Sequence, residues 1–183
     1  GGSASGSWFQ EWTDPESKKR MRNVVGILPG RNPELARQSV VIGAHYDHLG
    51  TTGTSKENAG KVHPGADDNA SGVAVLLELA SRLPLVSNME RPVVFVAFTG
   101  EEAGRKGSKY YVQNEKYYTA SRATGMINLD TVGRLGKGKL IILGAGSAKE
   151  WSSLFEEAAK PLKLEIALSM QDLDSSDQKS FQE

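Results

Sequence analysis

The stretch that decides the fold reads Arg91-Pro92-Val93-Val94-Phe95-Val96-Ala97-Phe98, and Thr99-Gly100-Glu101-Glu102 follows it directly. The apolar run has no polar alternation, which is typical of a strand buried on both faces of a sheet. Two adjacent carboxylates at the edge of a core repel each other and lose hydration, and a nearby cation would relieve both effects. Exposure to solvent would relieve them as well. The stretch therefore predicts a central strand and makes Glu101 and Glu102 candidates for a site.

Shorter apolar runs on both sides of this stretch predict further strands. They cover residues 23–28, 39–44, 125–129, 140–143 and 164–168. Apolar residues at helical spacing predict helices that follow Gly72 and Gly104, and another over residues 151–162. The alternation of strands and helices predicts an α/β sandwich with a largely buried sheet. Residues 1–21 are polar and begin with Gly and Ser, so we expect a flexible N-terminal segment or linker there.

The composition excludes several classes of protein and of site. The chain has 183 residues, 38% of them hydrophobic and 24% charged, which fits one soluble globular domain. It carries 22 basic and 22 acidic residues, and this balance argues against a nucleic-acid partner. No apolar run reaches the roughly 20 residues of a membrane span. The absence of cysteine excludes disulfides, thiolate zinc sites and cysteine nucleophiles.

Polar side chains stand at the ends of several predicted strands. His45 ends the strand at 39–44, Asp130 follows the strand at 125–129, and Asp68 lies on a loop that leads into a helix. Ligands of open α/β sheets bind beyond the carboxyl ends of the strands, where these groups converge. Taken singly, His45 is compatible with an ordinary loop histidine, and Asp68 with a helix N-cap. Together, an imidazole and several carboxylates suit divalent zinc, manganese or cobalt.

Four ordered motifs resemble a known family. They are Val41-Ile42-Gly43-Ala44-His45-Tyr46-Asp47, His63-Pro64-Gly65-Ala66-Asp67-Asp68-Asn69-Ala70-Ser71-Gly72, Phe98-Thr99-Gly100-Glu101-Glu102-Ala103-Gly104 and Asn128-Leu129-Asp130. In order and spacing they look like the co-catalytic, two-zinc aminopeptidases related to the secreted bacterial leucyl aminopeptidases and aminopeptidase Y. The resemblance covers about residues 22–183. It implies a zinc-exopeptidase catalytic domain: a three-layer α/β/α sandwich with a mixed, mostly parallel central sheet.

The resemblance also implies residue roles. The zinc ligands would be four side chains: His45, Asp68, Glu102 and Asp130. Asp68 would bridge both metals, and His45 and Asp130 would complete one of the two sites. Asp47 would support His45 from behind, and Glu101 would be the general base that acts on a metal-activated water. The implied reaction is hydrolysis of the N-terminal peptide bond of peptides or proteins, in an extracellular or periplasmic location.

The chain departs from the family pattern at its C-terminal end. The family uses a further histidine ligand late in the domain, after one more buried strand, whereas no histidine follows His63 in this chain. In many relatives a histidine also follows the pair that corresponds to Ser176-Asp177, where this chain has Gln178, and we assign no ligand role to Gln178. We therefore expect a C-terminally truncated domain whose second zinc, held by Asp68 and Glu102 alone, binds weakly. A complementing chain or segment would supply the missing ligand. Three alternatives stay open at this stage: a carboxypeptidase of the same fold, a glutaminyl cyclase, and a binding domain that has lost its metal.

Overall fold

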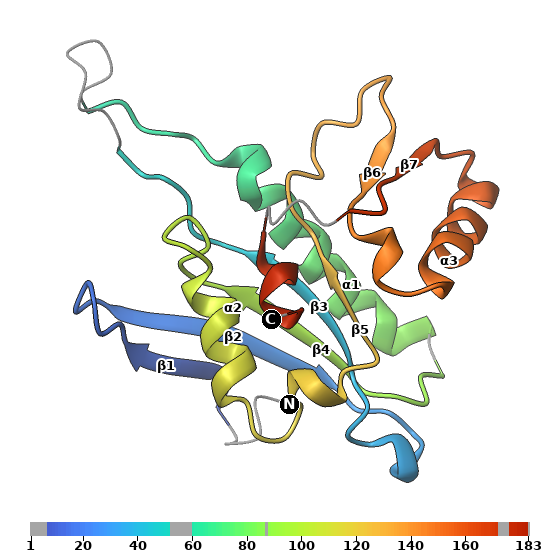
Figure 1. Ribbon diagram of the computed structural model, residues 1–183, viewed down its shortest axis with the longest axis horizontal. Helices are drawn as coiled ribbons and strands as arrows, with labels where there is room; N and C mark the ends of the chain where they lie inside the picture. The colour runs from blue at the N-terminus through green and yellow to red at the C-terminus, as the bar shows by residue number, and fades with distance from the viewer. Residues whose placement is uncertain (1–6, 52–59, 87, 172–175, 183) are drawn as a thin grey trace. The chain divides into compact units, whose positions relative to one another are not determined.

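The structure is a computed structural model that describes residues 7–51, 60–86, 88–171 and 176–182 (Figure 1). The chain forms two compact units. One comprises Gly1–Thr131 with Ser176–Glu183, and the other comprises Val132–Ser175. The residues predicted to bind metal all belong to the first unit.

A five-stranded mixed sheet forms the centre of the first unit. In spatial order its strands are β1 (Phe9–Thr13), β2 (Arg20–Leu28), β4 (Val93–Phe98), β3 (Val40–His45) and β5 (Gly125–Asn128). β4, β3 and β5 pair in parallel, and β2 pairs antiparallel with both β1 and β4. Only β2 therefore runs against the other four strands. The predicted central strand is β4, and the predicted mixed, mostly parallel sheet is confirmed.

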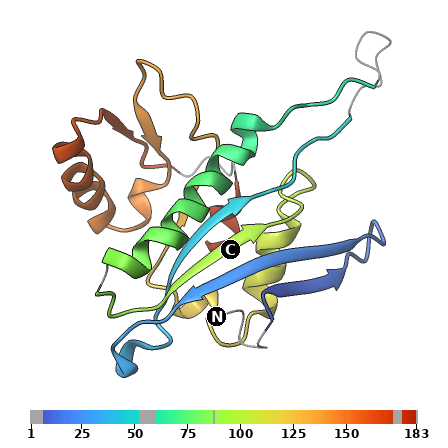
Figure 2. The same cartoon turned by 180° about the vertical axis from the view of Figure 1, so that it is seen from behind.

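Helices cover the two faces of this sheet and complete the three predicted layers. α1 (Gly72–Val86) packs on one face, where Leu76 contacts a cluster that includes Ile42 and Phe95. α2 (Lys106–Asn114) and the short helix η6 (Asp177–Phe181) pack on the other face. Figures 1 and 2 show α2 in front of the sheet in one view and α1 in front of it in the opposite view.

Aromatic side chains join α2 and η6 to the sheet. Tyr111 is fully buried, and its hydroxyl donates a 2.9 Å hydrogen bond to the carbonyl of Tyr118. Its ring contacts those of Phe98 and Phe181 at centroid distances of 6.1 and 5.8 Å. Burial of each such ring contributes about 2–3 kcal/mol. η6, far along the chain, is thereby anchored beside the carboxyl end of β4.

The N-terminal region differs from the flexible segment that we expected over residues 1–21. Residues 9–13 form β1, which pairs with β2, and the ring of Trp12 stacks on Tyr110 of α2 at 4.0 Å. Arg22 of β2 also pairs with Glu11 of β1. The prediction was wrong because it rested only on the polarity of these residues. An edge strand tolerates polar residues on its exposed face. Residues 1–6 of that segment lie outside the described residues.

The described part of the second unit, residues 132–171, contains a small parallel β pair and an α-helix. β6 (Leu140–Ile142) pairs with β7 (Ile166–Leu168), and α3 (Glu150–Ala159) lies between them in the chain. These elements agree with the strands and the helix predicted there. Short 3-10 turns in the two units are η1 (Pro33–Leu35), η3 (Ala120–Arg122), η4 (Ala145–Ser147) and η5 (Lys160–Leu162). Among the described residues, no helix has the length and apolar character needed to cross a membrane.

Candidate metal centre

His45 ends β3 and is almost completely buried, with 1% of its side chain exposed. Its Nδ1 lies 3.1 Å from the carbonyl oxygen of Asp47. A carbonyl accepts only, so Nδ1 donates to it, and in the neutral ring, which is the form that binds a metal, the lone pair is therefore on Nε2. Nε2 lies 3.1 Å from Asp68 Oδ1 and 3.5 Å from Asp130 Oδ1. The structure thus brings together the three residues predicted for the complete zinc site.

Asn69 explains how Asp68 reaches this position. Its side-chain amide donates to the carbonyl of Leu129 at 2.8 Å, and its oxygen accepts from the backbone N–H groups of Gly72 and Thr131. Asn69 therefore caps the start of α1 and joins that turn to the end of β5. Asp68 on the turn and Asp130 after the strand are held side by side as a result.

The Glu101–Glu102 pair is held by the carboxylate of Asp47. The backbone N–H groups of Glu101 and Glu102 donate to its two oxygens at 3.1 and 3.3 Å. Asp47 also contacts His45 through its carbonyl oxygen, while its nearest carboxylate oxygen lies 3.8 Å from Nδ1. A side chain in a loop takes whichever donors the fold presents, and here two free N–H groups at a chain reversal outcompete the imidazole.

Electrostatics differ among the groups of the site. Burial raises the pKa of Glu101 to about 7, against the opposing pull of His45. Burial would lower the pKa of His45, but the adjacent Asp130 outweighs it and raises that pKa to about 9 in the metal-free protein. Burial would raise the pKa of Asp130, but His45 keeps it below its usual range. A carboxyl group with a pKa near 7 suits a general base at neutral pH.

Two clusters of potential ligand atoms share Asp68. The His45 cluster consists of His45, Asp68 and Asp130, and the His48 cluster consists of His48, Asp68 and Glu102. In each cluster the ligand atoms lie within 4.8 Å of one another. Asp68 turns Oδ1 toward His45 and Oδ2 toward His48. One carboxylate between two imidazoles is the arrangement that a bridging ligand requires.

The donor set fits a metal on two independent grounds. In the described part of the chain, four buried atoms of the clusters have no hydrogen-bond partner: His48 Nδ1, Asp68 Oδ1, Glu102 Oε1 and Asp130 Oδ1. Ligands at about 2.0–2.2 Å from a tetrahedral zinc lie about 3.3–3.6 Å apart. In the His45 cluster the two distances from Nε2 are 3.1 and 3.5 Å, close to this range.

Two residues near the site had no assigned role from the sequence. His48 is one of three histidines in the chain, and its position three residues after His45 is the signal that could have found it. Asp177 of η6 is fully buried, and burial raises its pKa to about 6. Gln178, to which we assigned no ligand role, accepts a 3.2 Å hydrogen bond from Asn128 at the end of β5.

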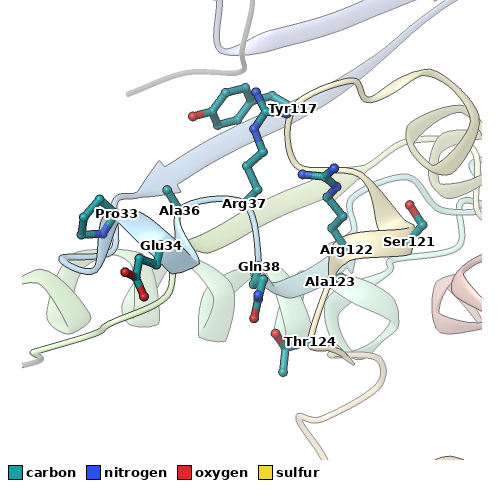
Figure 3. Close-up of a pocket in the computed structure, with 10 residues that line it drawn as sticks. All are labelled: Pro33, Glu34, Ala36, Arg37, Gln38, Tyr117, Ser121, Arg122, Ala123 and Thr124. Carbon is teal, nitrogen blue, oxygen red and sulfur yellow. The ribbon is translucent and has the colours of Figure 1, made fainter.

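A separate hollow lies at the amino ends of β3 and β5, away from His45 (Figure 3). Arg37 and Thr124, which line it, precede those two strands in the chain. Arg37 lies over the ring of Tyr117, 5.0 Å from its centroid. The lining residues include no histidine, so this hollow lacks the chemistry of the two clusters.

Comparison with known proteins agrees with this geometry. Residues 23–183 match the sequence model of peptidase family M28. Leucine aminopeptidase 1 of Trichophyton rubrum is 34% identical over 116 residues, which are 61% of this chain and 29% of that protein. Aminopeptidase YwaD of Bacillus subtilis is 34% identical over 115 residues, or 61% and 22% of the two chains. The chain thus spans less than a third of the length of these curated relatives.

Solved structures with the same fold include enzymes of two kinds. BSAP, a zinc aminopeptidase from Bacillus subtilis, aligns with a TM-score of 0.72 and 30% identity over 91% of this chain and 38% of that one. The glutaminyl cyclase of Porphyromonas gingivalis aligns with a TM-score of 0.73 over 94% of this chain and 63% of that one. At 22% identity, this likeness shows only that the two proteins share a fold. With the family match over residues 23–183, these findings establish that the chain belongs to peptidase family M28.

Proposed function

We propose that this chain carries the catalytic centre of a zinc aminopeptidase, which hydrolyses the N-terminal peptide bond of peptides. The observation that carries the proposal is the convergence of His45, Asp68 and Asp130, with distances of 3.1 and 3.5 Å from the imidazole Nε2 to the two carboxylates. Three protein ligands are the number expected of a catalytic zinc with an open position. Relatives that are named zinc or leucine aminopeptidases support the same reaction.

Each group has a place in the reaction. A zinc ion held by the His45 cluster would lower the pKa of a bound water and polarise the scissile carbonyl. Glu101, with its pKa near 7, accepts the proton of the attacking water as the oxygen bonds to the carbonyl carbon. Glu101 then delivers this proton to the leaving nitrogen as the C–N bond breaks. Asp47 is a positioning residue that holds the turn carrying Glu101.

A free N-terminus also fits the proposed metal centre. The α-amine of a peptide has a pKa of about 8, so part of it is neutral at neutral pH and carries a lone pair. A metal ion held by Asp68, Glu102 and Asp130 would have an open position for this lone pair, which would place the first peptide bond at the site. An acylated N-terminus offers no such lone pair, so we expect blocked peptides to be poor substrates.

Replacement of Glu101 by Gln tests the base assignment. The side chain keeps its size and loses its proton affinity, so we expect kcat to fall about 10²–10⁴-fold while zinc content and circular dichroism stay unchanged. Leucyl-p-nitroanilide is a suitable substrate for the zinc-loaded chain. Glu34→Gln is the matched control, because Glu34 lines the hollow at the amino end of β3. If Glu101→Gln keeps most of the activity, the assignment is wrong.

The same preparation distinguishes the reaction from those of related folds. A peptide with N-terminal glutamine reports cyclisation through loss of ammonia, detected by mass spectrometry. An N-acetylated peptide reports carboxypeptidase activity through release of its last residue. We expect hydrolysis at free N-termini and neither of the other products. Cyclisation without hydrolysis would overturn the proposed function in favour of glutaminyl cyclase chemistry, for which the shared fold with that enzyme provides a specific rival.

A further inference from the structure

His48 lies in the loop that follows β3, and its ring faces two carboxylates. Nδ1 is 2.9 Å from Glu102 Oε1 and 3.8 Å from Asp68 Oδ2. Among the described residues, neither Nδ1 nor Glu102 Oε1 has a hydrogen-bond partner, although both atoms are buried. Two buried polar atoms that approach without hydrogen-bond geometry both remain unsatisfied, which is unfavourable for each group. A cation between them would satisfy both.

The loop before α1 holds the ring of His48 in this orientation. A Cβ at Gly65 would lie 3.1 Å from Cγ and Cδ2 of the ring, so the ring packs against the backbone of Gly65 in the space that a side chain there would need. Gly65 also has a φ of +62°, a conformation that glycine adopts without strain. The ring of His63 lies edge-on to that of His48, with centroids 6.1 Å apart. The imidazole is thus packed in place with Nδ1 directed at the carboxylates.

The distances from His48 Nδ1 to the two carboxylates are close to those between the ligands of one zinc ion. Two ligands of a tetrahedral zinc lie about 3.3–3.6 Å apart. The values from His48 Nδ1, 2.9 and 3.8 Å, lie on either side of this range, and small side-chain rotations would bring both into it. Nitrogen from one imidazole and oxygen from two carboxylates suits zinc, manganese or cobalt.

We propose that His48 is a direct ligand of a second divalent metal ion, together with Glu102 and with Asp68 as the ligand shared between both ions. From the sequence we expected this second site to hold its metal weakly, through Asp68 and Glu102 alone. A third ligand gives it the same number of protein ligands as the first site and leaves one position open. The inference rests on the proposed function, since Asp68 belongs to both clusters.

Metal binding to the chain, measured without any assay of activity, tests the proposal. The chain is stripped with a chelator and titrated with Zn²⁺ by calorimetry, and then with Co²⁺ by absorption. We expect the wild type to bind two ions per chain and His48→Ala to bind one. Loss of a group that only supports a ligand weakens metal affinity about 10–100-fold, so loss of a direct ligand should weaken the second site by at least about 100-fold. His48→Gln preserves the size of the side chain and should give the same result.

Two further variants separate this inference from the proposed function. Glu34→Gln alters a carboxylate of the separate hollow at the amino end of β3, which belongs to neither cluster, and should still bind two ions. His45→Ala should lose the ion of the first site. Two ions bound with wild-type affinity by both His48 variants would overturn the role of His48 and leave the proposed function standing. The same conclusion would follow if the wild type binds a single ion, and His45→Ala loses this ion while the His48 variants keep it. A wild-type chain that binds no ion would overturn both.

Discussion

His45 and His48 face the same carboxylate from different surroundings. His45 is the last residue of β3, a strand paired on both sides, and its side chain is 1% exposed. His48 lies in the following loop, and its side chain is 20% exposed. The carboxylates that complete the two clusters are alike, with 23% of Asp130 and 22% of Glu102 exposed. The difference therefore lies in the histidines and in the elements that carry them.

The two histidines are held with different rigidity within one site. β3 is held by hydrogen bonds to β4 and β5, and the carbonyl of Asp47 fixes the ring of His45. His48 depends on packing against a loop backbone instead. A ligand on a rigid element is already in position before the metal arrives, so less conformational entropy is lost on binding. We expect the His45 cluster to bind its ion more tightly and to release it more slowly.

The largest expected effect comes from removing the ligand that the two clusters share. Asp68→Ala takes one carboxylate from each triad, so both ions should be lost in a single substitution. Peptide hydrolysis should fall to the background rate, since no metal-activated water remains. Metal content after dialysis and hydrolysis of leucyl-p-nitroanilide measure the two effects.

Asp67→Asn is the control for this prediction, because Asp67 is the neighbouring carboxylate and belongs to neither cluster. It should keep both ions and most of the activity. If Asp68→Ala still binds one ion with wild-type affinity, Asp68 serves a single cluster and the comparison between two linked sites fails.

A smaller effect is expected at Asp47, which acts through the backbone on both Glu101 and Glu102. Its carboxylate accepts the N–H groups of Glu101 and Glu102, so Asp47→Asn replaces one of two charged acceptors by a donor amide. We expect kcat/KM to fall about 10–100-fold, as for other groups that orient a metal site. The pH profile of kcat should shift as well, because the turn that sets the surroundings of Glu101 is loosened.

Metal content distinguishes this positioning role from that of a ligand. Asp47→Asn should keep the ion of the His45 cluster, since the carbonyl that contacts His45 is unchanged. Loss of that ion would show that the carboxylate, and not the carbonyl, supports the imidazole, as the sequence led us to expect.

The strands that position the site were predictable because burial leaves a strong local signal. β3 and β4 carry continuous apolar runs, and β5 carries a shorter one. His45 is the last residue of β3, and Glu101 and Asp130 come soon after the ends of β4 and β5. Two parallel pairings then bring His45 and Asp130 to the same edge. β1 was missed because it lies at the edge of the sheet, where Gln10 and Glu11 are compatible with a strand as well as with a linker.

The parts of the site that could not be predicted depend on contacts between loops. The position of His48 follows from the way the loop after β3 meets Gly65, and that contact has no fixed spacing in the sequence. The hydrogen bonds of Asp47 depend on which donors the chain reversal after β4 exposes. Local periodicity reports on strands and helices, whereas these contacts are decided only once the elements have packed.

The smallest expected effect is a pH dependence of the protein's stability, which arises from His45 and Glu101. In the metal-free protein the pKa of His45 is raised from 6.5 to about 9, so its contribution is full below about pH 6.5 and is lost as the pH rises through 9. The pKa of Glu101 is raised from 4.5 to about 7, so the folded state also binds this proton more strongly, and its contribution fades as the pH rises through 7. Both shifts make stability fall with rising pH.

Thermal unfolding of the chelated protein should therefore show a melting temperature that decreases between about pH 6 and about pH 9, by on the order of 5 °C. His45→Gln should reduce this slope, because the group whose pKa is raised from 6.5 to about 9 is gone. Zinc should oppose it, since the ion replaces the proton on His45 and binds the neutral ring more readily at high pH. A melting temperature that rises with pH in the chelated wild type would mean that His45 is not held by Asp130 in the metal-free protein. The geometry of the His45 cluster would then depend on the metal and not on β3, the strand that carries His45.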